Sequence, residues 1–143
     1  MRILVEVLDM KGYAIPIETE TKKNADFRRV LYTAEHSQLV LMSVNPGDEL
    51  GMEVHKSSDQ FFRFEEGEGK VIIDGVEHPV KDGVGVVVPS GAWHNVINTS
   101  KTSHLKLYTI YSPPHHKDGT VHHTKADALA SKEHFGGKTS EQE

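Results

Sequence analysis

Short runs of apolar and β-branched residues, separated by polar turns, repeat along most of the chain. These runs predict strands over residues 27–33, 38–44, 60–64, 70–74, 84–88, 94–98 and 105–111. Asp74-Gly75 is typical of a tight hairpin turn, and Asn45-Pro46-Gly47-Asp48 predicts a second turn. Many short strands at regular spacing are typical of a sandwich or barrel. The pattern therefore predicts an all-β fold.

The two ends of the chain differ from this middle part. Residues 3–8 predict a short strand, and a polar arm follows it. Residues 125–132 are the one stretch with a helical pattern, with Thr124 as its N-cap. The sequence thus divides into an N-terminal strand and arm (1–26), a β-barrel (27–111), and a histidine-rich C-terminal segment with a short helix and tail (112–143).

Composition narrows the function classes. The chain has 143 residues, enough for one domain with a single core, and a net charge of −5. The negative net charge argues against nucleic acid as a partner. The sequence has no basic amphipathic segment of the kind that binds a membrane surface. The chain contains no cysteine, which excludes disulfides and thiolate ligands. No apolar run suits a signal peptide or a membrane span, so we expect a cytoplasmic protein.

Two stretches keep a fixed spacing of glycine, histidine and other polar residues. The first places Gly47, Glu53, His55, Gln60 and Gly67 in one frame. The second does the same for Gly83, Pro89, Gly91, His94 and Asn98. This spacing resembles that of the two cupin motifs. The resemblance implies a jelly-roll barrel, the double-stranded β-helix, with a metal pocket.

The resemblance also implies a ligand set. Cupins usually offer His-x-His, then Glu, then a distant His. Here Glu53 stands at the first His, His55 at the second, Gln60 at the Glu, and His94 at the last place. Residues two apart on a strand share a face, so Glu53 and His55 point the same way, whereas Asp59 points away from Gln60's face. Nitrogen and oxygen ligands suit one divalent ion: Mn or Fe is favoured, with Ni, Co and Zn left open.

A second resemblance lies in residues 108–122, which are similar to the tail of small bacterial and archaeal cupins often labelled mannose-6-phosphate-isomerase-like. That label implies a fold and not a substrate. Five of the ten histidines lie at the C-terminal end, and their irregular spacing favours a solvated segment packed over the barrel. They are His115, His116, His122, His123 and His134.

The pocket and its chemistry follow from the same frame. Phe62 and Phe64 share the face of Gln60, and with Trp93 they are the predicted pocket-lining residues. Tyr108 and Tyr111, on the last strand, are candidate proton donors or orienters. The catalytic residues are unknown.

Three functions compete. The first is a metal-dependent enzyme with isomerase- or lyase-type carbonyl chemistry on a small oxygenated metabolite, such as a sugar acid or keto compound. The second is a non-haem dioxygenase, which two histidines and one carboxylate permit. The third is a non-catalytic sugar- or metabolite-binding module. In each case the expected partners are a small-molecule ligand and a second copy of the chain. We predict a homodimer through residues 3–8 and Phe61, because these apolar residues can cover exposed sheet edges.

Overall fold

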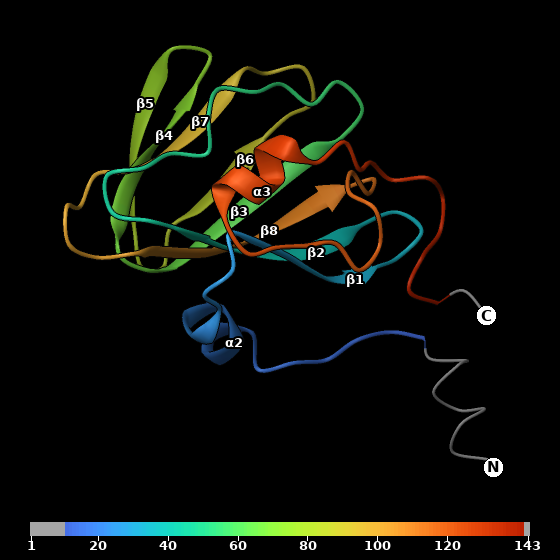
Figure 1. The fold of residues 1–143 in the computed structure, drawn as a ribbon. Helices are drawn as coiled ribbons and strands as arrows, with labels where there is room; N and C mark the ends of the chain where they lie inside the picture. Colours follow the sequence, from blue (N-terminus) through green and yellow to red (C-terminus); the bar gives the residue numbers. More distant parts are fainter. Residues whose placement is uncertain (1–10, 142–143) are drawn as a thin grey trace.

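Two antiparallel sheets pack face to face in the computed structural model, which describes residues 11–141 (Figure 1). The larger sheet has the strand order β6-β3-β8-β2-β1-β9, and the smaller has β5-β4-β7. The strands are β1 (Arg28–Thr33), β2 (Gln38–Val44), β3 (Asp59–Glu66), β4 (Glu68–Ile73), β5 (Val76–Lys81), β6 (Gly85–Val88), β7 (His94–Asn98), β8 (Leu105–Ser112) and β9 (Val121–His122). The helices are α2 (Ile17–Lys23) and α3 (Lys125–Ala130). The predicted all-β jelly roll is confirmed.

The core lies between the two sheets. Alternate residues of each strand point inward, as the period of two requires. The larger sheet contributes Val40, Met42, Phe62, Phe64, Leu105 and Leu107, and the smaller contributes Val71 and Val96; all are buried. The inward positions of β3 and β8 continue beyond this apolar layer to Gln60 and Tyr111, which are also buried. The same inner face therefore supplies the core and, at one end, polar side chains.

The Asp74-Gly75 turn is confirmed. Both residues have positive φ, 47° and 85°, as a primed hairpin turn requires, and they join β4 to β5. The hydrophobic pattern misses β5 itself, because the strand contains Pro79 and only Val80 is buried in it. Proline donates no ladder hydrogen bond, and β5 lies at the edge of the smaller sheet, where that loss is tolerated.

Helix α2 corrects the expectation of a polar arm without helix before residue 27. Its first turn holds Glu18 and Glu20 and its last turn Lys22 and Lys23, an arrangement that suits the helix dipole. The helix packs on the outer face of β8 and β3, and its Thr21 is fully buried. The predicted strand over 3–8 lies outside the described residues, so the dimer contact through it stays a prediction.

The C-terminal segment is more than a solvated cover. Thr124 caps α3 as predicted, in a capping box with Asp127. Before the helix, β9 pairs with β1 and extends the larger sheet. His116 and His122 are buried, which contradicts the expectation that the histidines lie in a solvated segment. Neither described helix has the length and apolar character needed to cross a membrane.

Candidate metal centre

Three ionisable side chains converge at one end of the barrel. One candidate ligand atom from each of Glu53, His55 and His94 lies within 4.8 Å of the other two. Oε1 of Glu53 is 3.2 Å from Nε2 of His55 and 4.0 Å from Nε2 of His94. Two atoms that each sit about 2.1 Å from one ion cannot be more than about 4.2 Å apart, so these two separations suit a shared ion.

The backbone sets this convergence. Glu53 and His94 form an isolated antiparallel bridge, in which each backbone N–H donates to the other residue's carbonyl at 2.9 Å. His55 is tied to the turn before His94, because the Gly91 N–H donates to the His55 carbonyl at 2.9 Å. Gly91 has φ +88°, a conformation that side chains disfavour. Gly91 and His94 of the second motif therefore both fix the backbone of the first motif, Gly91 at His55 and His94 at Glu53.

His94 is oriented as a ligand. Its Nδ1 lies 3.0 Å from the Ala92 carbonyl, which can only accept, so Nδ1 carries the proton. Nε2 then presents a lone pair, and this atom is buried without a hydrogen-bond partner among the described residues. A backbone carbonyl that fixes the imidazole tautomer in this way is typical of metal-binding histidines.

Gln60 shows the same combination. Its amide nitrogen donates to Oγ1 of Thr109 at 3.0 Å, which turns Oε1 the other way. That oxygen is buried and has no partner in the described part of the chain. Burying a polar atom without a hydrogen bond costs about 1–3 kcal/mol, so two such atoms at one end of the barrel indicate a ligand. The donor set fits a divalent ion.

The Glu53 carboxylate is held in its charged form. Burial raises the pKa of this group, but the hydrogen bond to His55, the charge of Arg28, and the charges that His55 and His94 carry when protonated outweigh burial and lower the pKa. An ionised carboxylate is the form that binds a cation. Asp59 is exposed and accepts a hydrogen bond from the Ser90 N–H, so it faces away as strand parity predicts.

The three predicted lining residues lie in different surroundings. Phe62 is fully buried, with its ring centroid 6.2 Å from that of His94, and Phe64 stacks behind it at 6.3 Å. Trp93 is 53% exposed, and its backbone N–H donates to Asp74. Phe62 therefore forms an apolar wall beside the candidate ligands, whereas Trp93 lies at the surface.

The two candidate tyrosines lie on opposite faces of β8. Tyr111 points inward, pairs across the strands with Gln60, and makes an edge contact with the His55 ring at 5.5 Å. Tyr108 contacts Phe61 at 6.5 Å on the outer face. Because the two tyrosines point to opposite faces of β8, Tyr108 lies away from the ligand group, and of the two only Tyr111 contacts it.

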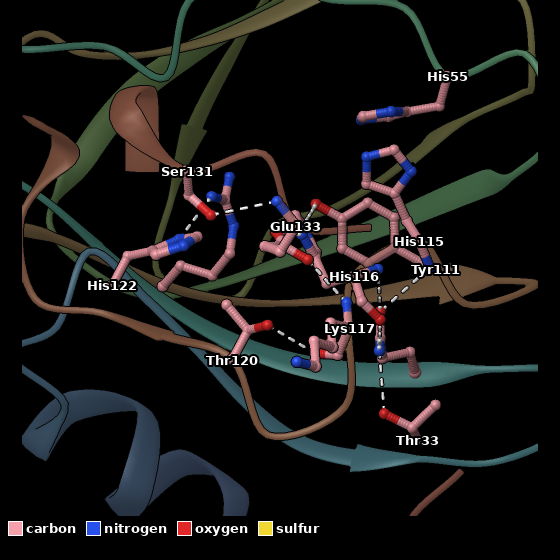
Figure 2. A network of polar contacts seen from close by, with 12 residues as sticks. Thr33, His55, Tyr111, His115, His116, Lys117, Thr120, His122, Ser131 and Glu133 are labelled. Carbon is pink, nitrogen blue, oxygen red and sulfur yellow. Dashed lines mark hydrogen bonds and ion pairs between the residues drawn. The ribbon is translucent and has the colours of Figure 1, made fainter. Parts of the chain in front are cut away.

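A hydrogen-bonded chain runs from Tyr111 away from the candidate ligands (Figure 2). The Tyr111 hydroxyl lies 3.2 Å from Nε2 of His116, and Nδ1 of His116 lies 2.7 Å from the Glu133 carboxylate. The carboxylate accepts, so Nδ1 carries the proton and Nε2 accepts from the tyrosine. The second Glu133 oxygen accepts from the Lys117 N–H at 2.7 Å. Every polar atom in this chain has a partner.

Burial and hydrogen bonds set the charges in this chain. Burial raises the pKa of Tyr111 and lowers that of His116, so both stay neutral near neutral pH. Burial alone raises the pKa of Glu133, but the hydrogen bonds from His116 and Lys117 outweigh burial and bring this pKa to about 2. His115 packs against both the His55 and Tyr111 rings, with centroids 4.3 and 5.3 Å away, and burial lowers its pKa to about 4. The strand and motif patterns did not predict that His116 and His122 are buried or that Glu133 pairs with His116. The reason is that the two-residue β9 is the only strand of the described chain after Ser112, and the motif spacing ends before it.

The fold and the ligand group define a small cupin with a candidate metal centre. Residues 40–111 match the cupin domain family, which is half of the chain. The chain therefore belongs to the cupin family.

Two relatives and two solved structures extend this comparison. Protein YrkC of Bacillus subtilis (strain 168) is 44% identical over 137 residues, which cover 92% of this chain and 73% of YrkC. A protein of Acanthamoeba polyphaga mimivirus is 42% identical over 76% of this chain and 70% of its own. The crystal structure of BH2720 from Bacillus halodurans has a TM-score of 0.82 and 45% identity, over 85% of this chain and 96% of BH2720. KdgF from Halomonas sp. shares the fold at a TM-score of 0.57 and 17% identity, over 60% and 76% of the two chains.

Proposed function

We propose that this cupin is a metal-dependent enzyme that acts on a small oxygenated metabolite, such as a sugar acid or keto compound, by isomerase- or lyase-type carbonyl chemistry. One observation carries the proposal: two buried polar atoms, Nε2 of His94 and Oε1 of Gln60, have no partner among residues 11–141. They lie at the same end of the barrel as His55 and the ionised carboxylate of Glu53. Glu53, His55, Gln60 and His94 would hold the ion.

The donor set guides the choice of ion. Two imidazoles, one carboxylate and one amide oxygen favour Mn or Fe, and Ni, Co and Zn remain alternatives. A bound ion supplies Lewis-acid polarisation of a carbonyl oxygen. The amide is the weakest donor, and four protein ligands leave exchangeable positions for an octahedral ion. These positions would accept paired oxygen atoms from the metabolite.

The protein residues around the ligands have defined tasks in this proposal. Phe62 excludes water on one side of the ligand group. Tyr111 keeps its proton near neutral pH and can relay a proton with His116. As the Tyr111 oxygen takes a proton from the metabolite, its own proton passes to Nε2 of His116, and the reverse transfer makes Tyr111 the candidate proton donor to the product. Glu133 then stabilises the charge that forms on His116, as a carboxylate behind an imidazole does in general.

Two other functions have specific support. Glu53, His55 and His94 make a set of two histidines and one carboxylate, which also suits a non-haem dioxygenase. A sugar- or metabolite-binding module is favoured by the lack of a carboxylate base beyond Glu53 among the described residues that form this ligand group. The finer assignment to the mannose-6-phosphate-isomerase-like cupins is likewise part of the proposal and rests on residues 108–122.

The test is a titration of the Co- and Mn-loaded protein with oxygen chelators, followed by metabolite screening with and without oxygen. An enzyme of the proposed kind should show a spectral change with a 2-keto acid or hydroxyketone and turnover that a metal chelator abolishes. Turnover that needs oxygen would identify a dioxygenase instead. Saturable binding without turnover would leave a binding module, and no spectral change with any chelator would reject the proposal.

A further inference from the structure

His115 has no task in the proposed function, although it touches the ligand group. Its ring packs on the His55 ring, with the two centroids 4.3 Å apart, and stacks on the Tyr111 ring at 5.3 Å. Figure 2 shows the three rings next to one another. The group of possible ligand atoms found within residues 11–141 comprises Glu53, His55 and His94 and leaves His115 out. His115 is therefore a neighbour of the candidate metal centre and not one of its ligands.

Hydrogen bonds of the main chain hold His115 in place. Its N–H donates to Oε1 of Gln38 at 3.1 Å, and its carbonyl accepts from the Phe135 N–H at 3.0 Å. Gln38 is itself buried, and its amide nitrogen donates to Oγ1 of Thr33 at 2.9 Å. Contacts with two distant parts of the chain therefore fix the backbone from which the His115 ring projects.

The adjacent residues His115 and His116 differ in how their ring nitrogens are used. His116 is buried, and its two nitrogens have partners in Tyr111 and Glu133. The His115 ring is only partly buried and forms no hydrogen bond within residues 11–141. Its nitrogens are not among the buried unpartnered atoms, so both reach solvent. A neutral imidazole offers one donor and one acceptor, and in His115 both are available.

Most of the side chains in contact with the ligand group, and most of the candidate ligands, are closed off from solvent. His55, Gln60, Phe62, His94 and Tyr111 are all buried. Glu53 and His115, in contrast, are partly exposed. A metabolite must therefore approach the ligand group on the side of these two residues. Since Glu53 is a candidate metal ligand, the free nitrogens of His115 are the groups available to contact the metabolite itself.

We propose that His115 is a binding residue for the metabolite, and that one of its ring nitrogens forms a hydrogen bond with an oxygen atom of the metabolite at the metal centre. An imidazole suits this task with either kind of oxygen, because it can donate to a carbonyl or carboxylate and accept from a hydroxyl. The fixed backbone would limit the entropy lost when the ring binds. This inference rests on the proposed function and adds a residue that holds the metabolite.

The test is a spectroscopic titration of the Co-loaded full chain with pyruvate, a 2-keto acid, and with hydroxyacetone, a hydroxyketone. His115→Phe keeps an aromatic ring beside His55 but removes both nitrogens, and His115→Gln keeps a polar side chain. His36→Phe makes the same exchange at an exposed position and is the control. Competition with a calibrated chelator measures the metal affinity of each variant. Thermal unfolding checks the fold, and His115→Ala carries the test if His115→Phe does not fold.

We expect His115→Phe to weaken the binding of at least one of the two compounds about three- to tenfold, which is the effect of one net hydrogen bond. His115→Gln should lose less affinity, and His36→Phe should lose none. Metal affinity should be the same in all variants, because His115 lies outside the ligand group. Unchanged binding in His115→Phe, or an equal loss in His36→Phe, would overturn the inference. A loss of metal affinity in His115→Phe would also overturn it, since His115 would then support His55 instead of the metabolite.

The failure of this inference can be told apart from the failure of the proposed function. If a compound perturbs the metal spectrum of the native protein and of His115→Phe at equal concentrations, the role of His115 is wrong and the proposed chemistry stands. If neither compound perturbs the spectrum of the native protein, the proposed chemistry fails, and the role of His115 fails with it.

Discussion

Two polar clusters share the inside of this barrel, and they differ in how completely their hydrogen bonds are satisfied. At the candidate metal centre, Nε2 of His94 and Oε1 of Gln60 are buried without partners in the described chain. In the neighbouring cluster, His116 uses both ring nitrogens and Glu133 uses both carboxylate oxygens. A complete network stabilises the fold, whereas an incomplete one in the same interior indicates a site that a ligand completes.

The largest expected effect is on metal content. His94→Ala should lower metal affinity more than ~100-fold, since even residues that only support ligands change it by ~10- to 100-fold. His55→Ala should act similarly, and Gln60→Ala should cost less, because a neutral amide is the weakest donor. Elemental analysis of purified proteins measures this series. His36→Ala removes an exposed histidine as the control, and equal metal in His94→Ala and native protein would contradict the comparison.

Substitutions in the hydrogen-bonded cluster of Tyr111, His116 and Glu133 should change the stability of the fold rather than its metal content. Glu133→Gln removes the charge that accepts from His116 and Lys117, and we expect a loss of about 1.5–3 kcal/mol in the free energy of unfolding. Metal content should not change. Urea denaturation measures the loss, and Glu49→Gln, at an exposed position, is the matched control. A Glu133 variant that keeps full stability but loses its metal would reverse the roles of the two clusters.

The pH dependence sharpens the same comparison. The pKa of Glu133 falls from an ordinary value of 4.5 to about 2 on folding. A lowered carboxyl pKa stabilises the fold above the unfolded value, so this contribution is full above about pH 4.5 and is lost as the pH falls through about 2. The stability difference between the native protein and Glu133→Gln should therefore shrink over this window. A difference that stays constant from pH 7 to pH 2 would show that the charge of Glu133 does not matter.

The smallest expected effect concerns a residue that supports a ligand. Thr109→Val removes the hydroxyl that orients the Gln60 amide but keeps a similar volume. We expect metal affinity to fall by about tenfold, at the low end of the effect of residues that orient ligands. Competition with a calibrated chelator measures the change. If Thr109→Val binds metal as tightly as the native protein, Gln60 does not act as a ligand through this orientation.

The sequence could predict most of the strands, because apolar alternation is a local rule, although β5 and β9 were missed. It could predict the grouping of Glu53, His55 and His94 because their spacing resembles that of the cupin motifs, although Glu53 and His55 lie outside the named strands. Helix α2 was missed although its acidic first turn and basic last turn, with Glu18 and Lys22 paired at 2.9 Å, are local signals. The burial of His116 was not predictable in this way. It depends on β9 joining β1 and on contacts between residues far apart in the chain, such as Gln38, whose side chain binds the His116 backbone.

The bridge between Glu53 and His94 has a consequence for how this site could change over evolution. Both of its hydrogen bonds join main-chain atoms, so they hold position 53 opposite His94 whichever side chain stands there. Exchange of one ligand type for another at position 53, such as the glutamate found here for the histidine usual in cupins, leaves these two bonds intact. The preference for one metal or one chemistry can then drift by single substitutions, while the architecture that presents the ligand is inherited unchanged.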